Sequence, residues 1–241
     1  MLMRLTRLLL AVLTVIAATG PAVAQFAPGP GNRGAASEQG HARNQPGKFD
    51  YYALALSWSP TYCDGATRNQ ADPQCNRSGG RPYAFVLHGL WPQHHKGWPE
   101  NCATGGSTYV PRPLIDRMLD IMPSPRLVIH EFRKHGTCSG LDANAYFDLS
   151  RKYYEKIKFP ARFDRPSQYF TISPGDIVKG FVEANPGLAS DHIAVVCGGP
   201  GNRLREVRIC FTREGAFRAC GDNESPRRLC SAASVTVPPV R

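Results

Sequence analysis

The chain has 241 residues, eight cysteines and a formal net charge of +10 at pH 7. This length suits one domain with a sizeable core, and no stretch after the N-terminal segment is long and apolar enough to cross a membrane. The positive charge favours a polyanionic partner, such as nucleic acid or an anionic cell surface, over an acidic protein.

Two N-terminal segments precede the predicted domain. Residues 1–24 have the features of a signal peptide, because two arginines precede an uncharged apolar run and residues 22–24 form a small-residue cleavage site. The run is shorter than the about 20 residues that span a bilayer, so we expect cleavage rather than an anchor, and a secreted or periplasmic protein outside the membrane. Residues 25–48 are rich in Gly, Pro, Gln and Asn, which predicts a flexible linker before a folded domain over residues 49–241.

The first part of the domain carries two predicted strands. Residues 49–58 are aromatic and aliphatic with little charge, which predicts a buried strand. A long polar loop follows between Cys63 and Cys75. Residues 83–87 predict a second strand, with His88 at its end.

Helices are predicted in the middle of the domain. Apolar residues recur at helical spacing over residues 114–122. Residues 127–135 predict another helix or turn, which Gly136 is expected to end. Residues 142–158 predict a helix with an aromatic face.

The C-terminal part is predicted to hold one helix and several strands. Residues 173–176 have the pattern of a capping box, so a helix is expected over residues 177–184. Strands are expected over residues 192–197, 204–211 and 216–220. Helices in the middle with strands at both ends indicate an α+β domain.

The cysteines indicate the compartment in which the protein works. An even count of eight behind an export signal predicts four disulfides in an oxidising compartment. Spacing alone leaves 105 possible pairings, so the connectivity stays open at this point.

The pattern His-Glu-Phe-Arg-Lys-His, which begins at His130, gathers groups suited to proton transfer. On an α-helix, Glu131 lies about 60° from Lys134 and about 40° from His135, so these three share one face. His130 lies on the flank of that face, and His88 can face the group from across the sheet. Such a set suits reaction at a phosphodiester, in which one group takes a proton while another gives one.

A zinc hydrolase is the competing interpretation of these histidines. The zinc-protease motif needs histidines at i and i+4, which lie on one helical face. His130 and His135 are instead five residues apart, which places them about 140° apart on a helix. Lys134 would also place a positive charge beside the metal. We therefore expect no metal and no cofactor.

Two segments carry a specific motif. Residues 85–92 have the sequence Phe-Val-Leu-His-Gly-Leu-Trp-Pro, and residues 130–138 have the sequence His-Glu-Phe-Arg-Lys-His-Gly-Thr-Cys. They resemble the two active-site segments of the ribonuclease T2 family of secreted endoribonucleases, and the resemblance covers about residues 49–230. It implies a central, mostly antiparallel sheet with helices packed on it, stapled by disulfides. The implied pairs are Cys102–Cys138, Cys197–Cys230 and Cys210–Cys220, with Cys63–Cys75 following partly by elimination.

The resemblance also implies a reaction. The ribose 2′-OH of single-stranded RNA attacks the adjacent phosphorus and gives a 2′,3′-cyclic phosphate, which water opens to a 3′-phosphate. His135 would be the base and His88 the acid. Glu131 and Lys134 would stabilise the phosphorane, and His130 would hold a phosphate oxygen. Duplex DNA lacks the attacking hydroxyl, so we expect no DNA cleavage.

Four side chains are candidates for binding the bases of RNA: Trp91, Gln93, Trp98 and Phe132. Trp91 is the first of them, because aromatic faces stack on single-stranded bases with little sequence demand. A tryptophan packed in the core is the alternative. Family members often carry tryptophan where this chain has Val128 and Phe132, which puts substrate preference in question. We expect low base specificity.

A different class of function is also open. The chain can be a non-catalytic secreted protein that binds RNA or a cell surface on the same scaffold. Substitution of a catalytic histidine would indicate that, and neither His88 nor His135 is substituted. Nothing in the sequence suggests a partner helix, so we expect a monomer.

Overall fold

The computed structural model describes residues 44–64, 72–75 and 82–241. The predicted signal peptide and most of the predicted linker lie outside these residues. The described end of that linker contacts the domain, since the Gly47 N–H donates to the Cys138 carbonyl at 2.9 Å and the Glu100 N–H donates to Asn44 Oδ1 at 3.2 Å. The packed domain therefore begins before residue 49, where we predicted its start.

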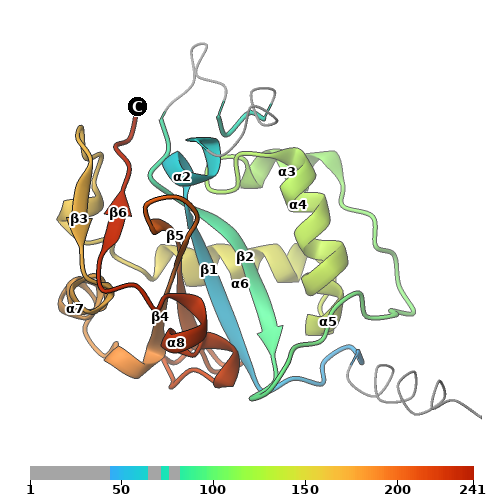
Figure 1. Cartoon of the computed structure of the whole chain (residues 1–241). Helices are drawn as coiled ribbons and strands as arrows, with labels where there is room; N and C mark the ends of the chain where they lie inside the picture. The colour runs from blue at the N-terminus through green and yellow to red at the C-terminus, as the bar shows by residue number, and fades with distance from the viewer. Residues whose placement is uncertain (1–43, 65–71, 76–81) are drawn as a thin grey trace, which may run out of the picture.

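One six-stranded sheet organises the domain (Figure 1). Its strands are β1 (Tyr51–Trp58), β2 (Phe85–Gln93), β3 (Phe170–Ile172), β4 (Ile193–Gly198), β5 (Arg203–Phe211) and β6 (Val235–Val237). β1 pairs with β2 on one side and β5 on the other, β4 pairs with β5, and β3 pairs with β6. In the described part of the chain these pairings are antiparallel and the short β5–β6 contact is parallel, which confirms the mostly antiparallel sheet.

Helices lie between and around the strands. They are α2 (Ser59–Asp64), α3 (Arg112–Met118), α4 (Pro125–Glu131), α5 (Thr137–Ser139), α6 (Ala143–Glu155), α7 (Pro174–Ala184) and α8 (Pro226–Leu229). A π-helical turn, Phe132–Gly136, joins α4 to α5. α7 begins as predicted, because the Ser173 hydroxyl accepts the Asp176 N–H at 3.0 Å. None of the described helices is long and apolar enough to cross a membrane.

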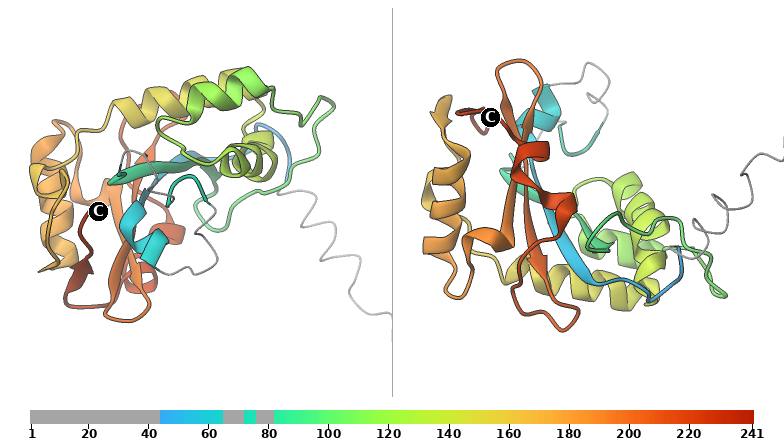
Figure 2. Two further views of the ribbon diagram at one scale, coloured as in Figure 1. Left: turned by 90° about the horizontal axis from the view of Figure 1, so that it is seen from above. Right: turned by 60° about the horizontal axis from the view of Figure 1, so that its bottom comes forward.

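The core lies between the sheet and α6, which runs along one side of the sheet (Figure 2). Alternate residues of β1 face this core, among them Leu54, Leu56 and Trp58, all fully buried. Residues of the other alternation, Tyr51 and Ala53, are equally buried on the opposite face. Because both faces are covered, the strand is apolar except at Ser57, which agrees with the buried strand that its sequence predicted.

Two predicted boundaries are wrong. The helical segment does not end at Gly136 but continues through α5 to Gly140, which has a φ of +79°. Gly136 has a packing role instead, because a Cβ there would lie 2.5 Å from the Phe132 ring and 3.0 Å from Tyr146. Residues 216–220 form no strand and contribute one isolated bridge, between Phe217 and Phe211.

Four disulfides use all eight cysteines. They are Cys63–Cys75, Cys102–Cys138, Cys197–Cys230 and Cys210–Cys220, the same pairs that the resemblance implied. The second of them ties the loop after β2 to α5. The two ends of the segment that carries α3, α4 and the π-helical turn are therefore held together.

Candidate active site

One cavity of about 340 Å³ gathers the residues predicted for catalysis. All five of them line it: His88, His130, Glu131, Lys134 and His135. Three of the predicted base-binding residues line the same cavity: Trp91, Gln93 and Trp98. The two sequence motifs, one on β2 and one on the segment from α4 to the π-helical turn, therefore meet in space.

A β-bulge in β2 directs His88 into this cavity. The pairing with β1 skips His88, which is the extra residue between Leu87 and Gly89. Leu87 and Leu90 therefore both face the core, although residues three apart in a regular strand point to opposite faces. For the same reason His88 and Trp91 both line the cavity. Our prediction that the strand ends at His88 is wrong, because pairing resumes after the bulge.

Glu131 forms the floor of the cavity, with 1% of its surface exposed. Its Oε2 accepts a hydrogen bond from Trp91 Nε1 at 2.7 Å, and its Oε1 lies 3.6 Å from His88 Nε2. Gly89 provides the space for this carboxyl, because a Cβ at that position would overlap Glu131 Oε2. Burial raises the pKa of Glu131 to about 7, although the charge of His88 and the Trp91 hydrogen bond oppose the rise.

The charged form of His88 is favoured by its surroundings. Burial by itself would lower the pKa of His88, but its hydrogen bond to Glu206 and the negative charges of Glu131 and Glu206 outweigh burial. The pKa of His88 is therefore raised above its usual value, and the ring keeps its proton to higher pH than a free histidine.

His135 is held in its neutral form. It is 6% exposed, and its ring lies against Trp91 with centroids 5.1 Å apart. Burial, assisted by the positive charge of Lys134, lowers the pKa of His135 to about 3. Its buried Nδ1 has no hydrogen-bond partner among the described residues. Two histidines whose environments push their pKa values apart are suited to act as an acid and a base in one site.

Lys134 and His130 complete the polar lining. Lys134 Nζ lies 3.6 Å from Glu100 Oε2, and His130 is exposed. Burial and the charges of Lys134 and His88 lower the pKa of His130. The angles that we assumed for an α-helix do not hold beyond Glu131, because the next turn is π-helical. Lys134 and His135 nevertheless reach the same cavity as Glu131.

The predicted base-binding residues have different surroundings. Trp98 is 46% exposed at the cavity, so its ring is accessible. Gln93 is buried, and its Oε1 accepts a hydrogen bond from Asn223 Nδ2 at 3.0 Å. Trp91 is 9% exposed, with His135 beside its ring and the Arg208 guanidinium 4.8 Å from its centroid. Its contacts are those of a packed residue that holds Glu131, which was the alternative interpretation.

Phe132 does not belong to the site. It is 2% exposed and packs in the core, with its ring 5.9 Å from Tyr146 and 6.2 Å from Phe147. The prediction that Phe132 binds a base is therefore wrong. The reason is that the residue after Glu131 points to the opposite side of the helical segment, toward α6.

The structure adds residues that the sequence did not suggest. Glu206 contacts His88, and Arg208 lines the cavity, both from β5. Asn223 and Arg228 line the same cavity from the C-terminal part of the chain. A signal existed for the first two, because charged residues at i and i+2 of a strand lie on one face.

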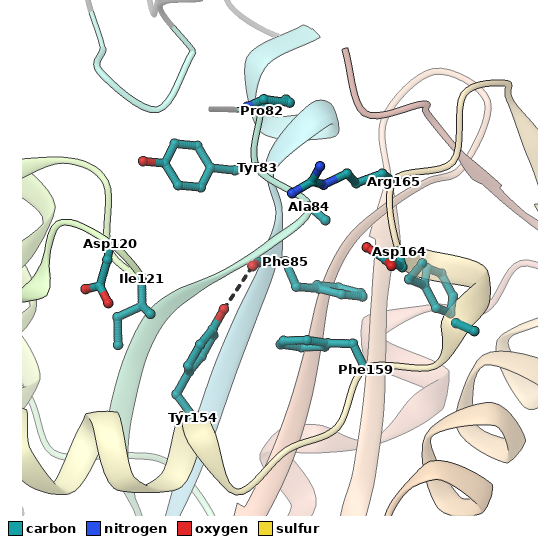
Figure 3. Close-up of a pocket in the computed structure, with 12 residues that line it drawn as sticks. Pro82, Tyr83, Ala84, Phe85, Asp120, Ile121, Tyr154, Phe159, Asp164 and Arg165 are labelled. Carbon is teal, nitrogen blue, oxygen red and sulfur yellow. Dashed lines mark hydrogen bonds between the residues drawn. The ribbon is translucent and has the colours of Figure 1, made fainter. Parts of the chain in front are cut away.

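A larger cavity, of about 670 Å³, lies away from these groups at the start of β2 (Figure 3). The rings of Phe85 and Phe159, which line this cavity, stack with their centroids 5.3 Å apart, and the Tyr154 hydroxyl donates to the Phe85 carbonyl at 3.2 Å. Its Asp120 is paired with Arg151 at 2.6 Å. No histidine or lysine is among the described residues that line it. Size therefore does not mark the reactive site in this protein.

The described part of the chain holds no group of three or more His, Cys, Asp or Glu side chains placed to hold a metal ion.

Solved structures with a similar fold include ribonucleases. The structure of trichomaglin, described as a novel S-like ribonuclease, matches with a TM-score of 0.63 at 24% identity and covers 80% of this chain and 100% of that one. RNase NT in complex with 5′-AMP matches with a TM-score of 0.58 at 25% identity, over 80% of this chain and 99% of that one. The fold and the site thus define a protein of the ribonuclease class.

Sequence comparison identifies the family. The sequence model of the Ribonuclease T2 family matches residues 49–220. A ribonuclease of Aeromonas hydrophila is 36% identical over 201 residues, which cover 79% of this chain and 85% of that protein. A probable ribonuclease of Haemophilus influenzae is 33% identical over 190 residues, which cover 74% of this chain and 63% of that protein. The chain belongs to the ribonuclease T2 family and is an enzyme that acts on RNA, which confirms the resemblance found in its two motifs.

Proposed function

We propose that this ribonuclease cleaves single-stranded RNA internally, by attack of a ribose 2′-OH on the adjacent phosphorus. One observation carries the proposal: two histidines in one cavity have pKa values moved in opposite directions, that of His88 upward and that of His135 to about 3. Above its pKa of about 3, His135 is thus a neutral proton acceptor, whereas His88 keeps its proton to higher pH than a free histidine and suits the role of proton donor.

The reaction uses this pair in sequence. His135 takes the 2′-OH proton as the 2′-oxygen–phosphorus bond forms. His88 then gives its proton to the 5′-oxygen as the phosphorus–5′-oxygen bond breaks, which leaves a 2′,3′-cyclic phosphate. In the second step the two histidines exchange roles, so that water opens the cyclic ester to a 3′-phosphate.

The other polar residues stabilise charge at phosphorus. Lys134 supplies a positive charge where the phosphorane is most negative. A ring N–H of His130 donates a hydrogen bond to a phosphate oxygen. Below its pKa of about 7, Glu131 is protonated and can donate a hydrogen bond to a non-bridging oxygen. Preorganised donors of this kind act strongly in a site with little water.

Base binding is proposed for the open side of the cavity. The exposed Trp98 offers a face for stacking, and the Gln93–Asn223 pair offers amide groups beside it. Stacking does not discriminate strongly among bases, which supports low base specificity. The 5′-AMP held by RNase NT supports binding of a nucleotide by this fold. We further propose an exported monomer that leaves DNA intact and is outside the membrane after loss of residues 1–24.

The pH dependence follows from the two histidines. We expect a bell-shaped profile of kcat/KM, because activity appears as His135 loses its proton, near its pKa of about 3, and is lost as His88 loses its proton above its usual pKa. Ionisation of Glu131 near pH 7 adds to the falling limb. Initial rates on a dinucleotide across about pH 3 to 9 measure the profile. A rate that still rises above neutral pH would contradict the assignment.

The reaction itself is tested by incubating the purified protein with total RNA in EDTA and analysing the 3′ ends. We expect cleavage to continue and 2′,3′-cyclic phosphates to accumulate before 3′-phosphates, while a DNA strand of matched sequence stays intact. Loss of activity that zinc restores would favour the zinc hydrolase. RNA that is retained on a filter with the protein but left uncut would favour the non-catalytic binder.

A further inference from the structure

His88 is oriented by a carboxyl group that arrives from another strand. Glu206 Oε1 on β5 lies 2.6 Å from His88 Nδ1, while His88 Nε2 points to Glu131 Oε1 at 3.6 Å. The side chain of Glu206 is only 13% exposed. One ring nitrogen is therefore engaged by Glu206, and the other one faces the cavity.

Glu206 is itself fixed by a network of buried charges. Its Oε2 accepts hydrogen bonds from Arg208 Nε at 3.2 Å and Arg208 Nη2 at 3.1 Å. Arg208 Nη1 lies 3.7 Å from Glu224 Oε1, and the Tyr51 hydroxyl donates to Glu224. Because positions i and i+2 of a strand share one face, Glu206 and Arg208 both reach the cavity side of β5. Arg208 thus fixes the Glu206 carboxylate through Oε2, while Oε1 contacts His88.

We propose that Glu206 is a positioning residue for the general acid. Its carboxylate accepts the Nδ1 proton of His88, so that the proton to be transferred is on Nε2 and faces the departing 5′-oxygen. Fixing the tautomer and ring orientation of a histidine is a known task of carboxylates in catalytic sites. Arg208 keeps Glu206 in place. This inference rests on the function proposed above and deepens it.

The charges around His88 support this role. The groups that face it are His130, Glu131, Lys134 and His135 on the helical segment, and Glu206 and Arg208 on β5. Glu206 is the one that bonds directly to Nδ1, and its contact with His88 and Arg208 outweighs burial, so that its pKa falls to about 2. It stays ionised throughout the pH range in which the site is expected to work. Removing the charge of Glu206 leaves Glu131 as the carboxyl group beside His88. Burial raises the pKa of Glu131.

The role predicts a dependence on the leaving group. In RNA the group that departs is a 5′-alkoxide, which needs the proton from His88 as the phosphorus–oxygen bond breaks. In a nucleoside 3′-(p-nitrophenyl phosphate), p-nitrophenolate departs as a stable anion without that proton. Removal of the 2′-OH proton by His135 is needed for both substrates. A defect in the general acid therefore affects the first substrate and spares the second.

The test compares kcat/KM of the full chain and Glu206→Gln on a dinucleotide and on the p-nitrophenyl ester. We expect Glu206→Gln to lose about tenfold or more on the dinucleotide, because the amide no longer fixes the tautomer of His88, and to change by less than about twofold on the ester. The falling limb of its pH profile should move to lower pH. Glu183→Gln, the same change at an exposed position on α7, should match the unchanged protein on both substrates.

The ratio of the two kcat/KM values decides the outcome, because a partly unfolded preparation lowers both values equally. Equal losses on the two substrates, or no loss on either, would overturn the positioning role. Glu206→Asp, which keeps a shorter carboxylate, should recover part of the dinucleotide activity. His88→Ala serves as the reference: if it cleaves the dinucleotide normally, the proposed function fails, whereas a selective defect in His88→Ala without one in Glu206→Gln rejects this inference alone.

Discussion

His135→Ala is expected to lower kcat/KM for RNA by about 10²–10⁴-fold, the usual contribution of a positioned general base. His88→Ala is expected to lose a similar factor. The two variants should differ on the p-nitrophenyl ester, because His135→Ala still lacks the group that removes the 2′-OH proton while His88→Ala lacks only a proton donor that this substrate does not need. Rates on both substrates, with circular dichroism to verify folding, measure the effect.

His192→Ala is the matched control for the two histidine variants. His192 pairs with Asp191 and accepts the Ala189 N–H, and it is not among the residues that line the catalytic cavity. We expect it to keep full turnover. Normal cleavage by a folded His88→Ala or His135→Ala protein would be incompatible with the acid–base mechanism.

Gly89→Ala is expected to disable the site without touching a titratable group. The new Cβ would overlap Glu131 Oε2 and lie 2.5 Å from Trp91 Nε1, so the buried carboxyl has to move. A displacement of about 1 Å in a catalytic site costs about 100-fold in rate, and overpacking of a core costs about 1–3 kcal/mol of stability. Turnover on RNA and the free energy of unfolding in urea measure the two effects.

Gly105→Ala provides the comparison for Gly89→Ala. A Cβ at Gly105 would meet nothing within 4 Å, so this variant tests the chemical change without the steric one. It should show unchanged turnover and unfolding. Unchanged turnover in Gly89→Ala as well would mean that Glu131 does not need its present position.

The sequence predicted the residues of the site better than their geometry. All five residues that the two motifs predicted for catalysis line the cavity, and the family resemblance implied their roles. The angles among Glu131, Lys134 and His135 were computed for an α-helix, and no pattern in side chains showed that the backbone there is π-helical. Phe132 is a candidate from the resemblance alone, because family members often carry tryptophan at this position, yet it packs in the core.

Contacts between strands that are far apart in the sequence could not be predicted from the sequence alone. Glu206 is 118 residues from His88, and its role depends on how β5 pairs with β1, which periodicity does not reveal. The bulge was missed because the predicted strand ends at His88, whereas pairing with β1 resumes at Gly89. β3 and β6 have three residues each, which is too short for an alternating pattern to appear.

Two backbone irregularities carry the catalytic residues. The bulge adds one residue to β2 at His88, and the π-helical turn widens the helix between Phe132 and Gly136. A regular strand would place His88 and Trp91 on opposite faces of β2, so the bulge is what allows both side chains to line the cavity. Deletion of one residue at the bulge would restore regular pairing of β2 with β1 and turn one of these two side chains away from the cavity, so the regular strand would be gained at the expense of turnover.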